Sequence, residues 1–417
     1  MTDPAAETVT IDLHGWAHGG EAVGRLPDGR ACFVARALPG ETVEVRVTAV
    51  HKRHATAQLV RVVTPSPHRV DPPCPHYDHC GGCQLQHAAP AHQLELKARV
   101  LVEQLQRIGR QPSPPVRGVI APDGAWPDGY RTWARMAVDP EGRLGFRRWH
   151  SHEVEPIDRC LLLTDRAQGL RDALGDGWSG AAEVQLTAGD DADVVTVTAD
   201  PDAPAGPAEP APDGPHGLAV RPSPRAPATV VRPPATVRVW VGGRTLQASA
   251  GAFFQSGPGT AAALVDAVKA VADVRPGDWV LDLYAGVGLL SAALAAAGGA
   301  VVAVEADAAA AADAEVNLAG VDAEVRQATV EAALGDIGEA DVVVLDPPRR
   351  GARPDVCRRI ASLGARQIVY VACDPAALAR DTRVLVGCGY ELESVDGLDL
   401  FGHTAHVEAV ASFRRAA

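Results

Sequence analysis

The stretch "VLDLYAGVGLLS", from Val280 to Ser291, decides the fold of the C-terminal part of this 417-residue chain. It is typical of a short apolar strand, a turn containing Gly286 and Gly288, and the start of a helix. Glycines at such a turn allow a ligand to approach the backbone closely at the helix N-terminus. Glu305 ends the next apolar segment, where nucleotide-binding α/β folds place the acid that binds ribose hydroxyls. Together these features predict a site for a nucleotide-like cofactor.

The residues around this turn discriminate between cofactors. A nicotinamide cofactor favours the pattern G-x-G-x-x-G, and Ser291 stands where the third glycine would be. The spacing of Asp282, Gly286 and Gly288 suits S-adenosylmethionine instead, because that molecule has no pyrophosphate to bind. We therefore expect S-adenosylmethionine, with a purely structural turn in another kind of α/β protein as the alternative.

The whole of residues 244–417 alternates apolar segments with Ala-rich helical connections. The candidate strands are "WVLDLYA", "AVVAVEAD", "AEVRQAT", "DVVVLDPP", "QIVYVACD" and "HVEAVASF". This alternation predicts a doubly wound, Rossmann-like α/β domain with its ligands at the C-terminal ends of the strands.

Residues 1–64 alternate apolar and polar side chains between glycine turns, which predicts a small β-barrel of the OB type. Such barrels often bind nucleic acid, and Lys52, Arg53 and His54 form a basic cluster. We expect RNA contact from this barrel, with a role in packing alone as the alternative.

Residues 65–243 show little periodicity and are expected to be irregular, apart from one helical segment at residues 89–109. Within them, Tyr130–His150 mixes arginines with aromatic residues, as grooves for single-stranded RNA do. An ordinary hairpin with a solvated basic face is the alternative. The Pro- and Ala-rich residues 199–234 are expected to be a flexible insertion.

A group of cysteines in the central region predicts a metal site. Three lie within "CPHYDHCGGCQLQ" and one lies far downstream; they are Cys74, Cys80, Cys83 and Cys160. Four thiols can hold zinc or a [4Fe–4S] cluster. Three clustered cysteines and a distant fourth favour the [4Fe–4S] cluster, with zinc as the alternative. The expected role is structural, and Cys32, Cys357 and Cys388 are expected to be unligated.

Cys373 lies at the end of the apolar strand in "IVYVACDPAALARD" and should face the cofactor crevice. Carbon 5 of a pyrimidine attacks a methyl sulfonium poorly unless a thiolate first adds to carbon 6, which is covalent catalysis. The C5 proton must then leave, so a base is needed, and Glu408 is the candidate. A plain core cysteine is the alternative.

Asp346 in "LDPPRRG" is expected at the mouth of the same crevice. In base methyltransferases a D-P-P turn borders the methyl donor and the target base. Enzymes that methylate amino groups usually follow it with an aromatic residue, whereas this chain has Arg349. The target is therefore not expected to be an exocyclic amine.

The motifs "FFQ" (residues 253–255), "DLYAGVG", "DPPRRG", "YVACDPAALARD" and "HTAHVE" follow one another in an order that resembles the RNA 5-methyluridine (uracil-C5) methyltransferases. The similarity covers nearly the whole chain. It implies a TRAM domain for the N-terminal barrel, a [4Fe–4S] cluster on the four cysteines, Cys373 as nucleophile and Glu408 as base. The residues expected to contact S-adenosylmethionine are Gln255, Tyr284, Gly286, Glu305 and Asp346.

Four positions depart from the family pattern. Ala285 replaces a usual cysteine, Ala372 replaces a frequent serine, and Gly257 and Asp374 each replace a usual asparagine. None of these changes removes a reacting group. The changes at Gly257 and Asp374 bear on recognition of the base.

The resemblance implies S-adenosylmethionine-dependent methylation of carbon 5 of a uridine in RNA. We expect 23S rRNA as substrate, with the tRNA T-loop second. A catalytically inactive RNA-binding iron–sulfur protein and a small-molecule methyltransferase are the alternatives. The net charge of −13 opposes RNA binding, so a local basic face is expected around the crevice, formed by Lys52, Arg53, Arg131, Arg135, Arg147 and Arg148.

The sequence contains no apolar run long enough to span a membrane, and its N-terminus does not look like a signal peptide. We therefore expect a cytoplasmic monomer without a membrane partner.

Overall fold

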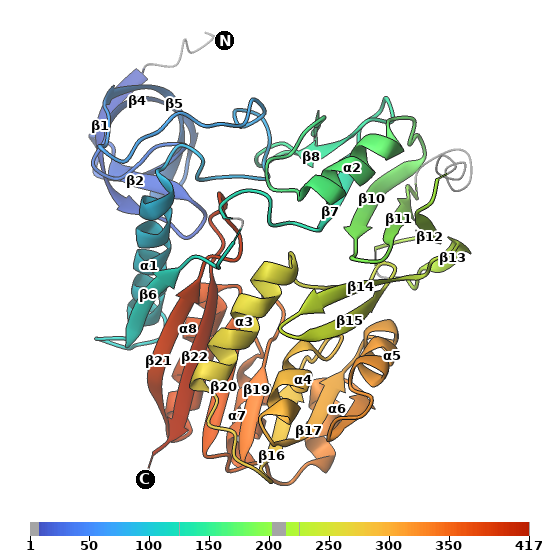
Figure 1. The fold of residues 1–417 in the computed structure, drawn as a ribbon. Coiled ribbons are helices and arrows are strands. Elements are labelled where there is room, and N and C mark those ends of the chain that lie inside the picture. The colour runs from blue at the N-terminus through green and yellow to red at the C-terminus, as the bar shows by residue number, and fades with distance from the viewer. Residues whose placement is uncertain (1–7, 125, 202–213, 225, 417) are drawn as a thin grey trace.

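The computed structural model describes residues 8–124, 126–201, 214–224 and 226–416. Three sheets dominate it (Figure 1): an N-terminal barrel, a central sheet and a C-terminal sheet. No helix within these residues is long and apolar enough to cross a membrane.

The predicted N-terminal barrel is confirmed. Its strands are β1 (Thr8–Trp16), β2 (Glu21–Arg25), β3 (Ala31–Ala35), β4 (Thr42–Val50) and β5 (His54–Thr64). They close in the order β1-β2-β3-β5-β4. Alternate residues such as Ile11, Leu13, Val43 and Val45 fill the interior, as the period of a strand requires.

The predicted doubly wound domain is also confirmed. Its eight-stranded sheet has the order β18-β17-β16-β19-β20-β22-β21-β6. The strands are β18 (Ala323–Gln327), β17 (Ala300–Glu305), β16 (Trp279–Leu283), β19 (Val342–Leu345), β20 (Gln367–Ala372), β22 (Glu408–Arg415), β21 (Tyr390–Leu398) and β6 (Val116–Ile120). From β18 to β20 neighbours run parallel, whereas β22 is antiparallel to β20. The strand order reverses between β16 and β19, which is where such sheets bind ligands.

Helices cover both faces of this sheet, and its central strands divide their side chains between two cores. Leu281 and Leu283 join the core that contains residues of α1 (Pro90–Arg107), α6 (Val330–Asp336), α7 (Pro354–Ser362) and α8 (Pro375–Gly387). Val280 and Val342 point the other way, into a core that contains residues of α3 (Pro258–Val271), α4 (Leu289–Ala296) and α5 (Ala308–Asn317). Burial on both faces explains why these strands are continuous apolar runs.

The prediction that residues 65–243 are irregular is wrong. They contain a seven-stranded sheet of order β13-β12-β11-β10-β7-β8-β9, with α2 (Asp165–Leu174) packed against β10. Its strands are β7 (Trp133–Val138), β8 (Leu144–Arg147), β9 (Val154–Pro156), β10 (Ala181–Ala188), β11 (Asp193–Ala199), β12 (Gly217–Arg221) and β13 (Thr229–Arg232). Short strands paired across long loops carry a weak local signal, because most of their stability comes from cross-strand contacts.

The expected domain boundaries and insertion also need correction. Strands β12 and β13 lie inside the expected flexible insertion 199–234, while residues 202–213 fall outside the described part. Strand β6 leaves the central region and pairs with β21 of the C-terminal sheet. The expected boundary at 243/244 falls within the turn of a hairpin, β14 (Thr236–Val241) and β15 (Arg244–Ser249).

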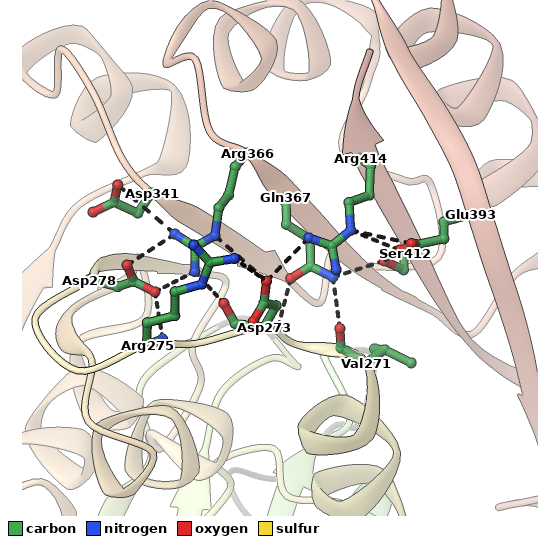
Figure 2. A network of polar contacts seen from close by, with 10 residues as sticks. All are labelled: Val271, Asp273, Arg275, Asp278, Asp341, Arg366, Gln367, Glu393, Ser412 and Arg414. Atoms are coloured by element: carbon green, nitrogen blue, oxygen red, sulfur yellow. Dashed lines mark hydrogen bonds and ion pairs between the residues drawn. The ribbon is translucent and has the colours of Figure 1, made fainter. Parts of the chain in front are cut away.

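A polar network ties together the edge of the C-terminal sheet that contains the first residues of β16, β19 and β20 (Figure 2). The buried Gln367 is one centre of this network. Its Nε2 donates to the carbonyl of Val271 (2.7 Å) and to Ser412 Oγ (2.9 Å), while its Oε1 accepts from the backbone N–H of Asp273 (2.8 Å). This side chain thus fastens the end of α3 to β20 and β22.

We predict that Gln367→Leu lowers the free energy of unfolding by about 1–3 kcal/mol, because it leaves buried polar groups without partners. Urea denaturation monitored by circular dichroism would measure the change. The matched control is Gln327→Leu at the exposed end of β18, which should change little. Equal stability of the two variants would show that the network does not hold this edge together.

Candidate active site

A cavity of about 1050 Å³ lies where the C-terminal edge of the eight-stranded sheet faces the central sheet. All seven residues predicted to act in catalysis or cofactor binding line it: Gln255, Tyr284, Gly286, Glu305, Asp346, Cys373 and Glu408. They are far apart in sequence, and the doubly wound topology brings them together as expected.

Cys373 and Glu408 lie at adjoining ends of neighbouring strands. Strand β20 ends at Ala372, which pairs with Ala409 of the antiparallel β22. Cys373 directly follows Ala372 and Glu408 directly precedes Ala409, and the charge of Glu408 acts on the Cys373 thiol. Because β22 runs antiparallel, its first residue lies at the edge where the parallel strands end.

The surroundings of Cys373 disfavour negative charge. Burial raises the pKa of the Cys373 thiol to about 12, and the nearby Glu408 and Asp346 add to this effect. The positive charge of Arg349 acts in the opposite direction. In this state the thiol is protonated at neutral pH, and Arg349 is the neighbouring cation that favours its ionisation.

The pKa of the Glu408 carboxyl group is also raised. Burial raises its pKa well above the ordinary value, the charge of Asp346 raises it further, and Arg349 lowers it. Within the part of the chain that the structure describes, Glu408 Oε1 is buried and has no hydrogen-bond partner. Burial also raises the pKa of Asp346. Two neighbouring buried carboxyl groups with raised pKa values are typical of sites that handle protons.

The glycine turn is open toward the cavity. Gly286 has φ of 54°, and a Cβ atom added there would meet no heavy atom within 4 Å, so a side chain would project into open space. Its backbone N–H donates to Glu305 Oε2 (2.9 Å), while Glu305 Oε1 accepts from the N–H of Asp307 (2.7 Å). A carboxylate oxygen accepts more than one hydrogen bond, so Glu305 can also accept from a ligand hydroxyl.

Asp282 and Ser291 have a structural relation in this turn. The hydroxyl of Ser291 donates to the buried carboxyl of Asp282. Burial raises the pKa of Asp282 to about 7. Ser291, which occupies the position of the third glycine in the nicotinamide pattern, thus forms a hydrogen bond with Asp282 across the glycine turn.

Packing explains one departure from the family pattern, Gly257, and another, Asp374, has a capping role that asparagine could also fill. A Cβ atom at Gly257 would lie 2.1 Å from the carbonyl oxygen of Tyr130, so a side chain cannot fit there without a backbone shift. Asp374 caps α8, because its Oδ1 accepts from the N–H of Ala377 (2.6 Å). Its Oδ2 lies 3.5 Å from Nε2 of His18 in the barrel. Asp374 directly follows Cys373, so this contact links the position next to Cys373 to the N-terminal barrel.

Only part of the predicted basic set lines the cavity. Arg131 and Arg135 do so, whereas Lys52, Arg53, Arg147 and Arg148 are exposed outside the lining. Arg148 forms ion pairs with Glu153 and Glu155. A single basic face made of all six residues stays a prediction.

Two arginines of the lining were absent from the predicted set, Arg221 and Arg349. Arg221 lies on β12, within the segment expected to be a flexible insertion, so its position had no local signal. Arg349 follows the D-P-P turn and donates to Nε2 of His406 (3.0 Å). Burial and Arg349 lower the pKa of His406 to about 4, so this ring is neutral and can accept that hydrogen bond.

Apart from Arg349, which follows β19 on the acidic side, the charges of the cavity are segregated. The acidic residues, Asp282, Glu305, Asp307, Asp346 and Glu408, come from strand ends of the C-terminal sheet. Arg131, Arg135 and Arg221 come from the central sheet or from the segment that leads into it. One wall therefore suits a cationic ligand and the facing wall suits a polyanion.

The four predicted metal ligands also come together. Cys74, Cys80, Cys83 and Cys160 line a second, smaller pocket of about 30 Å³, and Arg131 borders both this pocket and the large cavity. Within the described ranges, the group whose ligand atoms all lie within 4.8 Å of one another is a different one, His68, His92 and Glu95. The rings of His68 and His92 are stacked with an interplanar angle of 7°, which does not direct their nitrogens at a common ion.

Fold and cavity together define a class, the methyltransferases that use S-adenosylmethionine, and comparisons with known proteins narrow it. Residues 6–60 match the TRAM domain model, and residues 244–367 match the methyltransferase small domain model. The chain is 38% identical to an uncharacterised RNA methyltransferase of Streptomyces coelicolor, covering 100% of this chain and 96% of that protein. It is 36% identical to the 23S rRNA (uracil(1939)-C(5))-methyltransferase of Alkalilimnicola ehrlichii, covering 99% and 97%.

A solved structure is similar over the same length. The tRNA (uracil-54, C5)-methyltransferase of Pyrococcus abyssi, in complex with S-adenosyl-L-homocysteine, superposes with a TM-score of 0.75 at 25% identity, covering 97% of this chain and 99% of that one. The chain therefore belongs to the RNA uracil-C5 methyltransferase family, whose members depend on S-adenosylmethionine.

We predict that Glu408→Gln changes the pH dependence of stability. A folded-state pKa above the unfolded value gives stability that is present at low pH and is lost as the pH rises through the folded pKa. The variant has no such carboxyl group and avoids this loss. Its melting temperature relative to the wild type should therefore increase between about pH 5 and pH 8. The exposed Glu339→Gln is the control, and a difference that does not vary with pH would contradict the raised pKa.

Proposed function

We propose that this RNA uracil-C5 methyltransferase acts on a uridine of 23S rRNA, with Cys373 as the nucleophile and Glu408 as the base. The observation that carries the proposal is the position of these two residues at adjoining ends of β20 and β22, where both line the large cavity. Their position suits attack on carbon 6 and removal of the proton from carbon 5 of one ring.

In the proposed mechanism the Cys373 thiol first gives its proton to solvent, an ionisation that the positive charge of Arg349 favours. The resulting thiolate adds to carbon 6 of the uracil, and the electrons of the C5–C6 double bond make carbon 5 nucleophilic. Bound S-adenosylmethionine supplies the methyl group that carbon 5 receives. Glu408 then accepts the C5 proton, the C5–C6 double bond re-forms, and the Cys373–C6 bond breaks to release the thiolate. Arg349, held by the neutral His406, offsets the negative charge of this pair.

The proposed residues for S-adenosylmethionine are Gln255, Tyr284, Gly286, Glu305 and Asp346. Their fit rests on the open turn at Gly286 and on the acidic wall, because the ligand carries a positive sulfonium and an ammonium group. Glu305 is suited to ribose hydroxyls, since it ends the strand beside the turn.

The RNA would enter from the side of the central sheet. Arg131, Arg135 and Arg221 can contact phosphates there, and the target base would be flipped out of its stack into the cavity. Phe253 is 65% exposed at the cavity and lies edge-on to Trp133, with ring centroids 6.1 Å apart. Exposed rings at such a position stack on bases.

The preference for 23S rRNA rests on the similarity to the Alkalilimnicola ehrlichii protein, which is named a 23S rRNA (uracil(1939)-C(5))-methyltransferase. The tRNA T-loop stays the second candidate, because the similar Pyrococcus abyssi structure is of a tRNA (uracil-54, C5)-methyltransferase.

We also propose that the four cysteines hold a [4Fe–4S] cluster. The four thiols line one pocket, and three of them lie close together in sequence with the fourth far downstream, a pattern that favours the cluster. Zinc is the second candidate. The adjacent Arg131 can balance the charge of the thiolates.

We predict that RNA containing 5-fluorouridine traps the proposed intermediate, because fluorine at carbon 5 cannot leave as a cation. A slowly migrating protein–RNA band should appear on a denaturing gel with S-adenosylmethionine present, and Cys373→Ala should abolish it. The exposed Cys388→Ser is the matched control and should retain the band. Comparing rRNA with tRNA fragments tests the substrate, and no band with either RNA would favour a catalytically inactive RNA-binding protein.

We predict that Cys83→Ser loses the metal group while Cys388→Ser retains it. Protein purified without oxygen should contain iron and acid-labile sulfide in equal amounts, measured by elemental analysis and a sulfide assay. Zinc without sulfide in the wild type would instead assign the site to zinc. The same metal content in the Cys83 variant and the wild type would contradict the assignment of this ligand.

A further inference from the structure

The segment that precedes Glu408 lies between β21 and β22 and forms part of the cavity. Phe401, Thr404 and His406 of this segment line the cavity beside Glu408. His403 has φ of 62°, an uncommon conformation for a residue with a side chain. Surrounding contacts must hold such a backbone in place, and they thereby determine where β22 and its first residue begin.

The strongest of these contacts come from residues 80–85, here called the cysteine loop because it contains two of the four grouped thiols. The backbone N–H groups of Gln84 and Leu85 both donate to the carbonyl oxygen of His403, each at 2.9 Å. The side chain of Gln84 accepts from the N–H of Ala405 at 3.1 Å through Oε1. Its Nε2 donates to the carbonyl of Gly81 at 2.7 Å.

Side chains of α1 also hold this segment, at His403 and at its start, Asp399. Gln93 accepts from the N–H of His403 (3.1 Å) and donates to the carbonyl of Leu85 (3.1 Å). Lys97 and Asp399 form a buried ion pair. Among these side chains, Gln84 bonds the residue nearest in sequence to Glu408, namely Ala405. The barrel covers this contact, because Gly20 packs against both residues so closely that a Cβ atom would lie 2.9 Å from Ala405 and 3.1 Å from Gln84.

Glu408 itself lacks a comparable support. Its Oε1 has no hydrogen-bond partner within the described residues, so the backbone determines the position of the carboxyl group. A displacement of about 1 Å in a reacting group can slow a reaction on the order of 100-fold. Strand pairing holds the backbone of Glu408 opposite Leu398 of β21, and the hydrogen bonds of the preceding segment are further contacts that can align the base with carbon 5.

We propose that Gln84 is a positioning residue for the removal of the C5 proton, acting through the segment before Glu408. The inference rests on the proposed role of Glu408 as base. In that step Glu408 takes the proton from carbon 5, the C5–C6 double bond forms and the Cys373 sulfur leaves carbon 6. A displaced base slows this step and leaves the protein bonded to the methylated RNA. Gln84 directly follows Cys83, so the loop that contains two of the grouped thiols also contacts the segment that leads to Glu408.

The test uses the full-length holoprotein and RNA with ordinary uridine carrying tritium at carbon 5. Gln84→Met keeps the length of the side chain and removes both polar atoms, whereas Gln84→Glu keeps the acceptor for the Ala405 N–H. Gln84→Met should release tritium roughly 10- to 100-fold more slowly and accumulate the covalent protein–RNA species on a denaturing gel. The exposed Gln106→Met is the control and should behave like the wild type.

Further measurements separate positioning from a general structural defect. Gln84→Glu should release tritium faster than Gln84→Met, and iron content and KM for S-adenosylmethionine should stay unchanged in both. Adding Gln84→Met to Glu408→Gln should have little further effect, because both act on the same step.

Tritium release at the wild-type rate by Gln84→Met would overturn the inference, and so would loss of iron from both Gln84 variants. A wild type that forms no adduct on 5-fluorouridine RNA would instead contradict the proposed function itself. The two failures are therefore distinguishable.

Discussion

The antiparallel pairing of β22 with β20 is the constraint on which the rest of the site depends. Parallel strands deliver only their last residues to the crevice edge, whereas the reversed β22 delivers its first residue, Glu408, to the same place. The pairing of Ala372 with Ala409 then brings this carboxyl group near Cys373, the residue after β20. A slip of one residue would turn one of the two side chains to the other face of the sheet.

The second requirement is a wall opposite this edge, and the central sheet provides it. Acidic residues at the strand ends of the C-terminal sheet face arginines contributed largely by the other sheet, across one cavity. The net charge of −13 is a sum over the whole chain and does not describe this local separation. An acidic protein can thus present arginines to a polyanion where the cavity opens and acids to a cationic cofactor within it.

Concentrating buried acids in this way costs stability. Burial raises the pKa values of Asp282, Asp346 and Glu408, so ionisation of each opposes folding as the pH rises. The two apolar cores of the doubly wound sheet and the polar network at its opposite edge (Figure 2) offset that cost. The active site lies at one edge of the sheet. The polar network lies at the opposite edge, where both polar atoms of the Gln367 side chain form hydrogen bonds.

The sequence by itself determined the features that are local: the barrel strands, the strand–turn–helix around Gly286, and the strand ends that carry Glu305, Asp346 and Cys373. These follow from side-chain periodicity and turn residues within about ten positions of each other. Only the tertiary structure decided the central sheet, the entry of Arg221 into the cavity, and the contact of Gln84 with Ala405. The physical reason is that these features consist of pairings between segments far apart in the chain, whose stability arises from contacts that no local pattern encodes.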